Sequence, residues 1–182
     1  GGSYSGATQY RMLATQPPHL VAQFVRQSSS DYYIEWVYRS GVFEHGFNIS
    51  WTLKHASTNA VKLAPEGMED EVVTRLTKAS DDYQKWLEHV PISPLPPVAD
   101  LQDWFADWMD HPNQGEYWNE FSIVRSHDRV DVPIHHFGSW YDCFLRGTLE
   151  NYVGMRSKAV NKQARSGQRL TIGPWVHNPS PA

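Results

Sequence analysis

The stretch Gly1-Gly2-Ser3-Tyr4-Ser5-Gly6 decides how the rest of this chain is interpreted. A serine with a glycine two positions before it and small residues two and three positions after it is typical of a sharp turn from a strand into a helix. The small neighbours are needed because the serine backbone is strained and the strand passes close to the helix. Good helix formers follow up to Ala14, and Pro17-Pro18 predicts the end of that helix.

The next segment predicts a parallel sheet. Residues 20–25 form a short apolar run bounded by turn residues, which indicates a buried strand. A strand-to-helix turn followed by a strand is a βαβ unit, and such a unit belongs to an α/β fold. We therefore assign residues 1–31 to the first part of an α/β core.

Residues 32–127 show helical periodicity without a clear strand, and we assign them to an inserted, all-helical cap. The apolar positions predict a helix through Trp51, a second one between Val72 and Val90, and a third that begins at an N-cap Asp100. Glu35 and Glu44 are compatible with a site for a substrate ammonium group, but we favour a solvated helix face.

Residues 128–182 return to the α/β pattern and form the second part of the core. A strand is predicted over 132–137, a helix over 144–157 and a further strand over 169–172. The buried side of the helix is predicted to carry four apolar residues: Leu145, Leu149, Tyr152 and Val153.

The predicted topology places three candidate catalytic residues at the ends of strands. Ser3 lies at the turn, and Asp142 and His177 come just after the two later strands. In parallel sheets, functional sites gather beyond the carboxyl ends of the strands. The order Ser, Asp, His is that of the α/β-hydrolase catalytic triad. A serine needs a base to remove its proton, an imidazole can do so, and a carboxylate can orient the imidazole.

Other residues near this triad have candidate roles. The backbone N–H of Tyr4 is expected to donate to an oxyanion. Ser5 is a rival nucleophile that lacks a glycine two positions before it. For four aromatic residues we favour a substrate-pocket wall over core packing: Trp140, Tyr141, Phe144 and Trp175. A non-catalytic binding module that retains the hydrolase fold is the alternative to an enzyme.

Three blocks of the sequence resemble the cocaine esterase / X-Pro dipeptidyl-peptidase (CocE/NonD-type) family of serine hydrolases. Residues 1–6 match G-x-S-Y-x-G and residues 173–177 match G-P-W-x-H. Residues 138–144 match G-W-Y-D-x-F with one departure, Ser139, which stands where glycine is usual before the tryptophan. The resemblance implies hydrolysis of esters or amides, with cocaine-like esters, amino-acid esters, β-lactam acyl side chains and X-Pro peptides as substrate classes. It also implies an upstream tyrosine that completes the oxyanion hole and a downstream β-jelly-roll domain.

Composition restricts the partners. A net charge of -4 and a pI near 6.1, without a lysine and arginine run, argue against nucleic acid or an anionic membrane. His135 and His136 are adjacent and point to opposite faces of a strand, so we predict no metal site, and we predict no cofactor. The expected partner is a small-molecule ester or amide or a short peptide, and the oligomeric state is left open.

The start of the sequence leads to one further expectation. There is no initiator methionine and no strand before the turn, so we expect a part of a longer protein. A signal peptide, if there is one, belongs to the upstream part. We favour a cytoplasmic location, which these residues do not fix.

Overall fold

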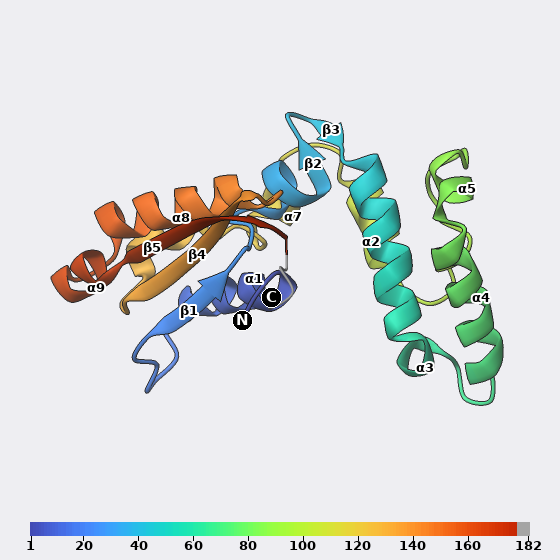
Figure 1. Cartoon of the computed structure of the whole chain (residues 1–182), viewed down its shortest axis with the longest axis horizontal. Helices are drawn as coiled ribbons and strands as arrows, with labels where there is room; N and C mark the ends of the chain where they lie inside the picture. Colours follow the sequence, from blue (N-terminus) through green and yellow to red (C-terminus); the bar gives the residue numbers. More distant parts are fainter. Residues whose placement is uncertain (178–182) are drawn as a thin grey trace. The chain divides into compact units, whose positions relative to one another are not determined.

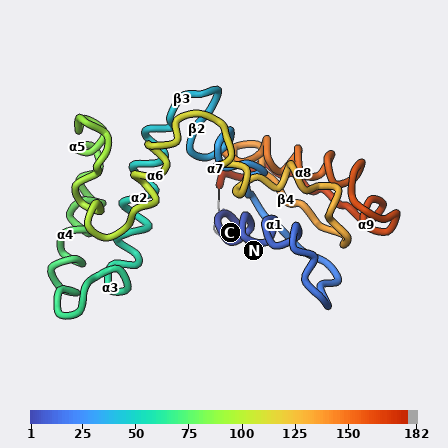
Figure 2. The backbone as a smooth tube through the Cα atoms, turned by 180° about the vertical axis from the view of Figure 1, so that it is seen from behind, coloured from blue at the N-terminus to red at the C-terminus, as the bar shows by residue number. Residues whose placement is uncertain are grey.

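The structure is a computed structural model that describes residues 1–177. The chain forms two compact units, one made of residues 1–40 together with the chain from Gln114 onward, and the other made of Gly41–Asn113. Figure 2 lets the reader follow the chain from one unit into the other and back. We keep the assignment of residues 32–127 to a cap as a proposal.

The first unit is built on a parallel sheet with the strand order β1-β4-β5 (Figure 1). The strands are β1 (Gln23–Arg26), β4 (Ile134–Tyr141) and β5 (Arg169–Val176). Gly2 also pairs in parallel with Arg26, so the residue before Ser3 runs alongside β1. The predicted α/β class with a parallel sheet is confirmed.

The later strands are longer than predicted. Pairing of β4 with β5 continues beyond residues 137 and 172, the predicted ends of the two strands. A register shift between Ser139 and Tyr141 absorbs the irregularity, so Ser139 is opposite Gly173 but Tyr141 is opposite Val176. The strands therefore run up to the residues immediately before Asp142 and His177.

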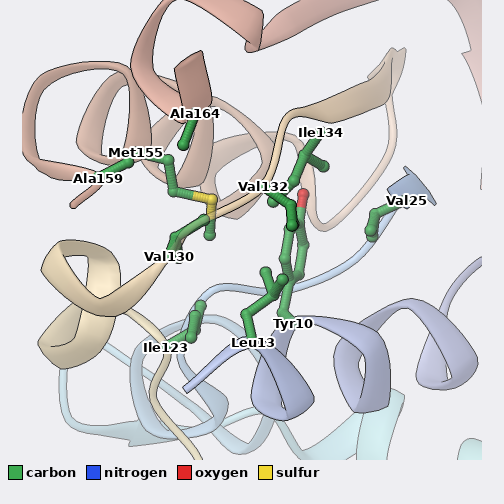
Figure 3. Packing of buried hydrophobic residues seen from close by; sticks show 10 residues of the cluster. All are labelled: Tyr10, Leu13, Val25, Ile123, Val130, Val132, Ile134, Met155, Ala159 and Ala164. Carbon is green, nitrogen blue, oxygen red and sulfur yellow. The ribbon is translucent and has the colours of Figure 1, made fainter. Parts of the chain in front are cut away.

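Helices α1 (Tyr4–Leu13) and α8 (Leu145–Lys158) pack on the same face of this sheet. Figure 3 shows Tyr10 and Leu13 of α1 meeting Val25, Ile134 and Met155 in one hydrophobic core. The predicted buried side of α8 is only partly right: Leu145, Leu149 and Tyr152 are half-buried, whereas Val153 is 62% exposed. The fully buried positions of α8 are small or polar residues and one methionine: Gly147, Thr148, Asn151 and Met155.

The remaining elements of the first unit are short. They are η1, a π-helical turn (Tyr33–Val37), β2 (Tyr38–Arg39), α7 (Glu116–Asn119), the 3₁₀ turn η2 (Val124–Arg129) and α9 (Lys162–Gly167). Asp31 stabilises the start of η1, since its Oδ1 accepts the backbone N–H groups of Tyr33 and Ile34.

The second unit is mainly helical and has its own apolar core. It contains β3 (Val42–Phe43), α2 (His45–Thr58), α3 (Ala60–Leu63), α4 (Glu69–Asp81), α5 (Tyr83–Leu87) and α6 (Trp104–Asp110). The helix predicted from Val72 to Val90 is interrupted at Asp82, after a run of weak helix formers. Asp100 does not cap a helix: α6 begins at Trp104, and Asp100 forms an ion pair with Arg75. No helix among residues 1–177 is both long and apolar enough to cross a membrane.

Candidate active site

The turn at Ser3 has the strained geometry that the sequence predicts. Ser3 has φ 55° and ψ -128°, and α1 starts at the next residue, Tyr4. Such a backbone conformation is uncommon for a residue with a side chain and is retained only where surrounding contacts impose it. The Ser3 side chain is thereby presented at the junction of a strand segment and a helix.

Backbone hydrogen bonds and close packing hold this turn. Ser3 donates its N–H to the carbonyl of Arg26 at 3.0 Å, and its own carbonyl accepts from the N–H groups of Gly6 and Ala7. A Cβ atom at Gly6 would lie 2.9 Å from the Cβ of Ser28 and 3.0 Å from Cγ1 of Val25. Glycine at position 6 is therefore required for α1 to approach β1.

Folding brings Ser3, Asp142 and His177 together. Nε2 of His177 lies 2.9 Å from Oγ of Ser3 across 174 positions of sequence, and Nδ1 of His177 lies 2.7 Å from Oδ1 of Asp142. The side chain of Asp142 is fully buried, whereas that of His177 is 28% exposed.

The hydrogen-bond partners assign the imidazole tautomer. An ionised carboxylate only accepts, so Nδ1 of His177 carries the proton that is donated to Asp142. Nε2 is then an acceptor for the hydroxyl of Ser3. This is the arrangement in which an imidazole can take a proton from a serine. Ser5, the rival nucleophile, is exposed on the first turn of α1, and the hydroxyl beside His177 is that of Ser3.

The four predicted pocket residues occupy different environments. Trp140 and Tyr141 are 60% and 71% exposed, and Trp175 is 37% exposed with its ring stacked on Phe137. Phe144 is buried, and its ring packs edge-on against the imidazole of His177 at 5.3 Å between centroids. Phe144 thus supports the histidine, while the other three present aromatic surface to solvent.

Glu35 is not on the solvated helix face that we favoured, because it is buried beneath α8. Its Oε2 accepts the backbone N–H of Ser30 at 2.8 Å, and Ser30 donates its hydroxyl to Glu150. Desolvation by burial, together with the charge of Glu150, raises the pKa of Glu35 to about 7. This carboxyl is a structural group under the loop that follows β1.

The chemistry of the one cluster with metal-ligand geometry within residues 1–177 does not suit a metal. The cluster consists of Asp142, Cys143 and His177, whose ligand atoms lie within 4.8 Å of one another. Desolvation and the neighbouring Asp142 carboxylate raise the pKa of Cys143 to about 12, so the sulfur stays a thiol near neutrality. The other two members, Asp142 and His177, are already hydrogen-bonded to each other.

No sequence signal pointed to a role for the polar residues that follow β1. Residues 27–31 are all buried, although three consecutive serines are typical of an ordinary loop. The hydroxyl of Ser28 donates to the carbonyl of Ser3 at 2.9 Å, so this loop contacts the strained turn directly. A buried role for a polar loop is not visible in a pattern that depends on hydrophobic periodicity.

The parallel sheet, the helices on it and the turn at Ser3 define an α/β-hydrolase fold. The sequence profile of the family described as X-Pro dipeptidyl-peptidase (S15 family) matches residues 1–179. The chain therefore belongs to the X-Pro dipeptidyl-peptidase (S15) family, and the suspected resemblance is confirmed.

Known proteins agree with this assignment. The chain is 25% identical to the cocaine esterase of Rhodococcus sp. (strain MB1 Bresler), over 98% of this chain and 30% of that protein. A CocE/NonD family hydrolase from Staphylococcus aureus has a similar fold, with a TM-score of 0.60 and 19% identity over 95% of this chain and 23% of its own. An alpha-amino acid ester hydrolase aligns with a TM-score of 0.59 and 18% identity, over 98% of this chain and 28% of its own. The chain thus spans about 30% or less of these relatives.

Proposed function

We propose that this chain carries the catalytic triad of a serine hydrolase that cleaves ester or amide bonds through an acyl-enzyme on Ser3. The proposal rests on one observation, the continuous hydrogen-bonded path from Ser3 through His177 to Asp142. Membership in a hydrolase family supports it. Each of the three residues matches one of the sequence blocks that carry the resemblance.

In the first half of the reaction, Oγ of Ser3 attacks the carbonyl carbon of the substrate while Nε2 of His177 takes the hydroxyl proton. Asp142 stabilises the imidazolium and keeps Nδ1 protonated. The backbone N–H of Tyr4 is the proposed donor to the negative oxygen of the tetrahedral intermediate. The intermediate collapses when His177 protonates the leaving alcohol or amine, which leaves an acyl group on Ser3.

In the second half, a water molecule replaces the leaving group. His177 removes a proton from this water as its oxygen attacks the acyl carbon. A second tetrahedral intermediate breaks the bond to Oγ of Ser3, and His177 returns the proton to Ser3. The carboxylic acid is released and the enzyme is regenerated without a cofactor.

The proposed substrates are small esters or amides or short peptides. The family and the relatives named above comprise a peptidase and two esterases, namely X-Pro dipeptidyl-peptidase, cocaine esterase and alpha-amino acid ester hydrolase. Trp140, Tyr141 and Trp175 lie next to the triad in sequence and present aromatic surface to solvent. We propose that these three rings contact the substrate, whereas Phe144 acts by packing on His177.

The direct test is covalent labelling of the intact protein with a fluorophosphonate, followed by mass-spectrometric mapping of the adduct. We expect the adduct on Ser3, no adduct in a Ser3→Ala variant, and normal labelling in the matched Ser5→Ala variant. Labelling of Ser5, or no labelling of the folded wild type, would reject the proposal and favour a non-catalytic binding module.

A second experiment separates the substrate classes. Hydrolysis of p-nitrophenyl esters, amino-acid esters and Gly-Pro amides is compared at equal concentrations in wild-type protein and in Ser3→Ala. Ser3→Ala should lower the rate for the preferred class by about 10⁴-fold or more. The class with the largest Ser3-dependent rate identifies the preferred bond.

A further inference from the structure

Gln27 connects the two strand ends that carry Asp142 and His177. Its Nε2 donates to Oγ of Ser139 at 2.8 Å and to the backbone carbonyl of Val176 at 2.6 Å. Gln27 and Ser139 are both fully buried. One amide group therefore bridges β4 and β5 from the loop that follows β1.

Each partner of Gln27 lies next to a member of the triad. Val176 directly precedes His177, and the carbonyl of Ser139 accepts the backbone N–H of Asp142 at 3.2 Å. The bridge also lies where the pairing of β4 with β5 shifts register, between Ser139 and Tyr141. A side-chain donor at this point stabilises strand ends that the regular ladder holds less well.

The backbone of Gln27 is constrained as well. Its φ is 47°, a left-handed value that is uncommon for glutamine, and its N–H donates to the carbonyl of Phe137 at 2.7 Å. The next residue, Ser28, donates its hydroxyl to the carbonyl of Ser3. Gln27 and Ser28 therefore contact the three segments that carry Ser3, Asp142 and His177. Such contacts are typical of a strained segment held in place for function.

We propose that Gln27, with Ser139 as its acceptor, is a positioning residue that aligns Asp142 and His177 for the reaction at Ser3. This inference rests on the proposed function. Ser139 stands where the family block usually has glycine, and glycine offers no side-chain acceptor. The departure at Ser139 and the buried Gln27 therefore form one hydrogen-bonded pair in this chain.

The first test compares Gln27→Met, Ser139→Ala and the double variant in the intact protein. Methionine keeps the length of glutamine but cannot donate to Ser139 or to Val176. Gln27→Met should lower kcat about 100-fold, as a misaligned catalytic group does, with KM changed less than about threefold. Ser139→Ala should lower kcat only about tenfold, since the hydrogen bond from Gln27 to the carbonyl of Val176 remains. The double variant should be no slower than Gln27→Met, because both changes remove the same contact.

A second readout separates positioning from a loss of folded protein. The rate of fluorophosphonate labelling is measured against pH in folded wild type and Gln27→Met. In the variant, the half-maximal rate should move to lower pH, because an imidazole that has lost its aligned carboxylate is less readily protonated. A merely structural role would lower the amount of active protein without moving this profile.

Gln168→Met is the matched control. Gln168 is also a buried glutamine, and it donates to two backbone carbonyls, but it lies just before β5 at the other end of that strand. Its loss should destabilise the fold while the folded fraction keeps the wild-type kcat and pH profile. An effect on kcat equal to that of Gln27→Met would overturn the proposed positioning role.

The outcomes distinguish this inference from the function on which it rests. Wild-type protein that is not labelled on Ser3 rejects the proposed function and this inference with it. Labelled wild type together with unchanged kcat in Gln27→Met, or with multiplying effects in the double variant, rejects the positioning role alone. If Gln27→Met does not fold, Ser139→Ala decides: a tenfold loss of kcat supports the role, and an unchanged kcat rejects it.

Discussion

The Oδ1 atom of Asp142 lies 2.7 Å from Nδ1 of His177, while the other carboxylate oxygen, Oδ2, is buried and has no hydrogen-bond partner among residues 1–177. A buried carboxylate with one strong partner depends on that partner for its stabilisation. The hydrogen bond between Asp142 and His177 therefore links the orientation of the imidazole to the position of the carboxyl end of β4.

Asp142→Asn should reduce kcat/KM by about 10⁴-fold while leaving the protein folded. The asparagine amide can donate to Nδ1 of His177, which would place the imidazole proton on Nε2, where it cannot accept from Ser3. Steady-state kinetics on the preferred ester measures the loss. Cys143→Ser is the control at the neighbouring position: the Cys143 thiol lies 3.7 Å from Oδ1 of Asp142, and serine keeps a donor there, so kcat/KM should change less than about threefold. A loss below tenfold in Asp142→Asn would contradict the assigned role.

Trp140→Ala should raise KM for substrates with bulky acyl or leaving groups and leave kcat within about threefold. The indole is 60% exposed, so its removal costs little folding stability and removes mainly contact area for a ligand. The effect is measured by comparing acetyl and benzoyl esters of the same alcohol. An equal change in KM for both would contradict a role of Trp140 in the pocket.

The stability of the first unit should fall as the pH drops from about 6.5 to 4. His136 is buried between Tyr10 and Gln168, and desolvation lowers its pKa from 6.5 to about 4. Because Gln168 Nε2 donates to backbone carbonyls, its Oε1 accepts from His136, and Nδ1 of the neutral imidazole accepts the Tyr10 hydroxyl. The unfolded chain binds this proton below pH 6.5 and the folded chain does not, so unfolding becomes easier by on the order of 3 kcal/mol.

Urea unfolding at pH 7, 5.5 and 4 measures this dependence in wild type and in His136→Gln. The variant should lose most of the pH dependence assigned to His136, because an amide takes up no proton. The control His135→Gln changes the neighbouring, less buried histidine. It should keep the wild-type pH dependence of unfolding, since His136 is intact. Equal pH dependence in wild type and His136→Gln would refute the assignment.

Glu35→Gln should stabilise the folded state above pH 7. The folded pKa of Glu35, about 7, exceeds its ordinary value of 4.5, so the favourable protonated form is lost as the pH rises from 4.5 through 7. Glutamine stays neutral, and its carbonyl can still accept the N–H of Ser30. Thermal unfolding at pH 8 and pH 5 should show a gain of about 1–3 kcal/mol at pH 8 that shrinks at pH 5. Glu116→Gln, at an exposed residue, is the control and should change stability by less than about 0.5 kcal/mol.

Gly147→Ala should destabilise the fold by more than about 2 kcal/mol. An added Cβ would lie 2.0 Å from Oε2 of Glu35 and 2.5 Å from the backbone N of Ser30, so α8 or the loop after β1 must move. Gly46→Ala, in α2, is the matched control because no atom lies within 4 Å of its added Cβ. That change should be neutral or stabilise by about 0.5–1 kcal/mol. Denaturant unfolding of both variants makes the comparison, and equal effects would contradict the close packing of α8 on Glu35.

Local pattern was sufficient for the sheet and for the order of the site residues. Glycine spacing at Ser3 predicts the strained turn, and the apolar runs predict three parallel strands. The later two, β4 and β5, end directly before Asp142 and His177. Helix details were less predictable. The buried side of α8 carries Gly147, Thr148 and Asn151, because close approach to Glu35 and to β4 selects small and polar residues there. Hydrophobic periodicity assigns such residues to the surface.

The sequence by itself determined the parallel α/β arrangement, the family, and the types of residue at the ends of the strands, because each depends on spacing along the chain. Only the tertiary structure decided that Nε2 of His177 reaches Ser3, that Phe144 lies behind the imidazole, and that Gln27 bridges Ser139 and Val176. These contacts join residues more than one hundred positions apart in all but one case, Phe144 with His177. Their geometry depends on strand register and side-chain packing, which spacing along one chain does not encode.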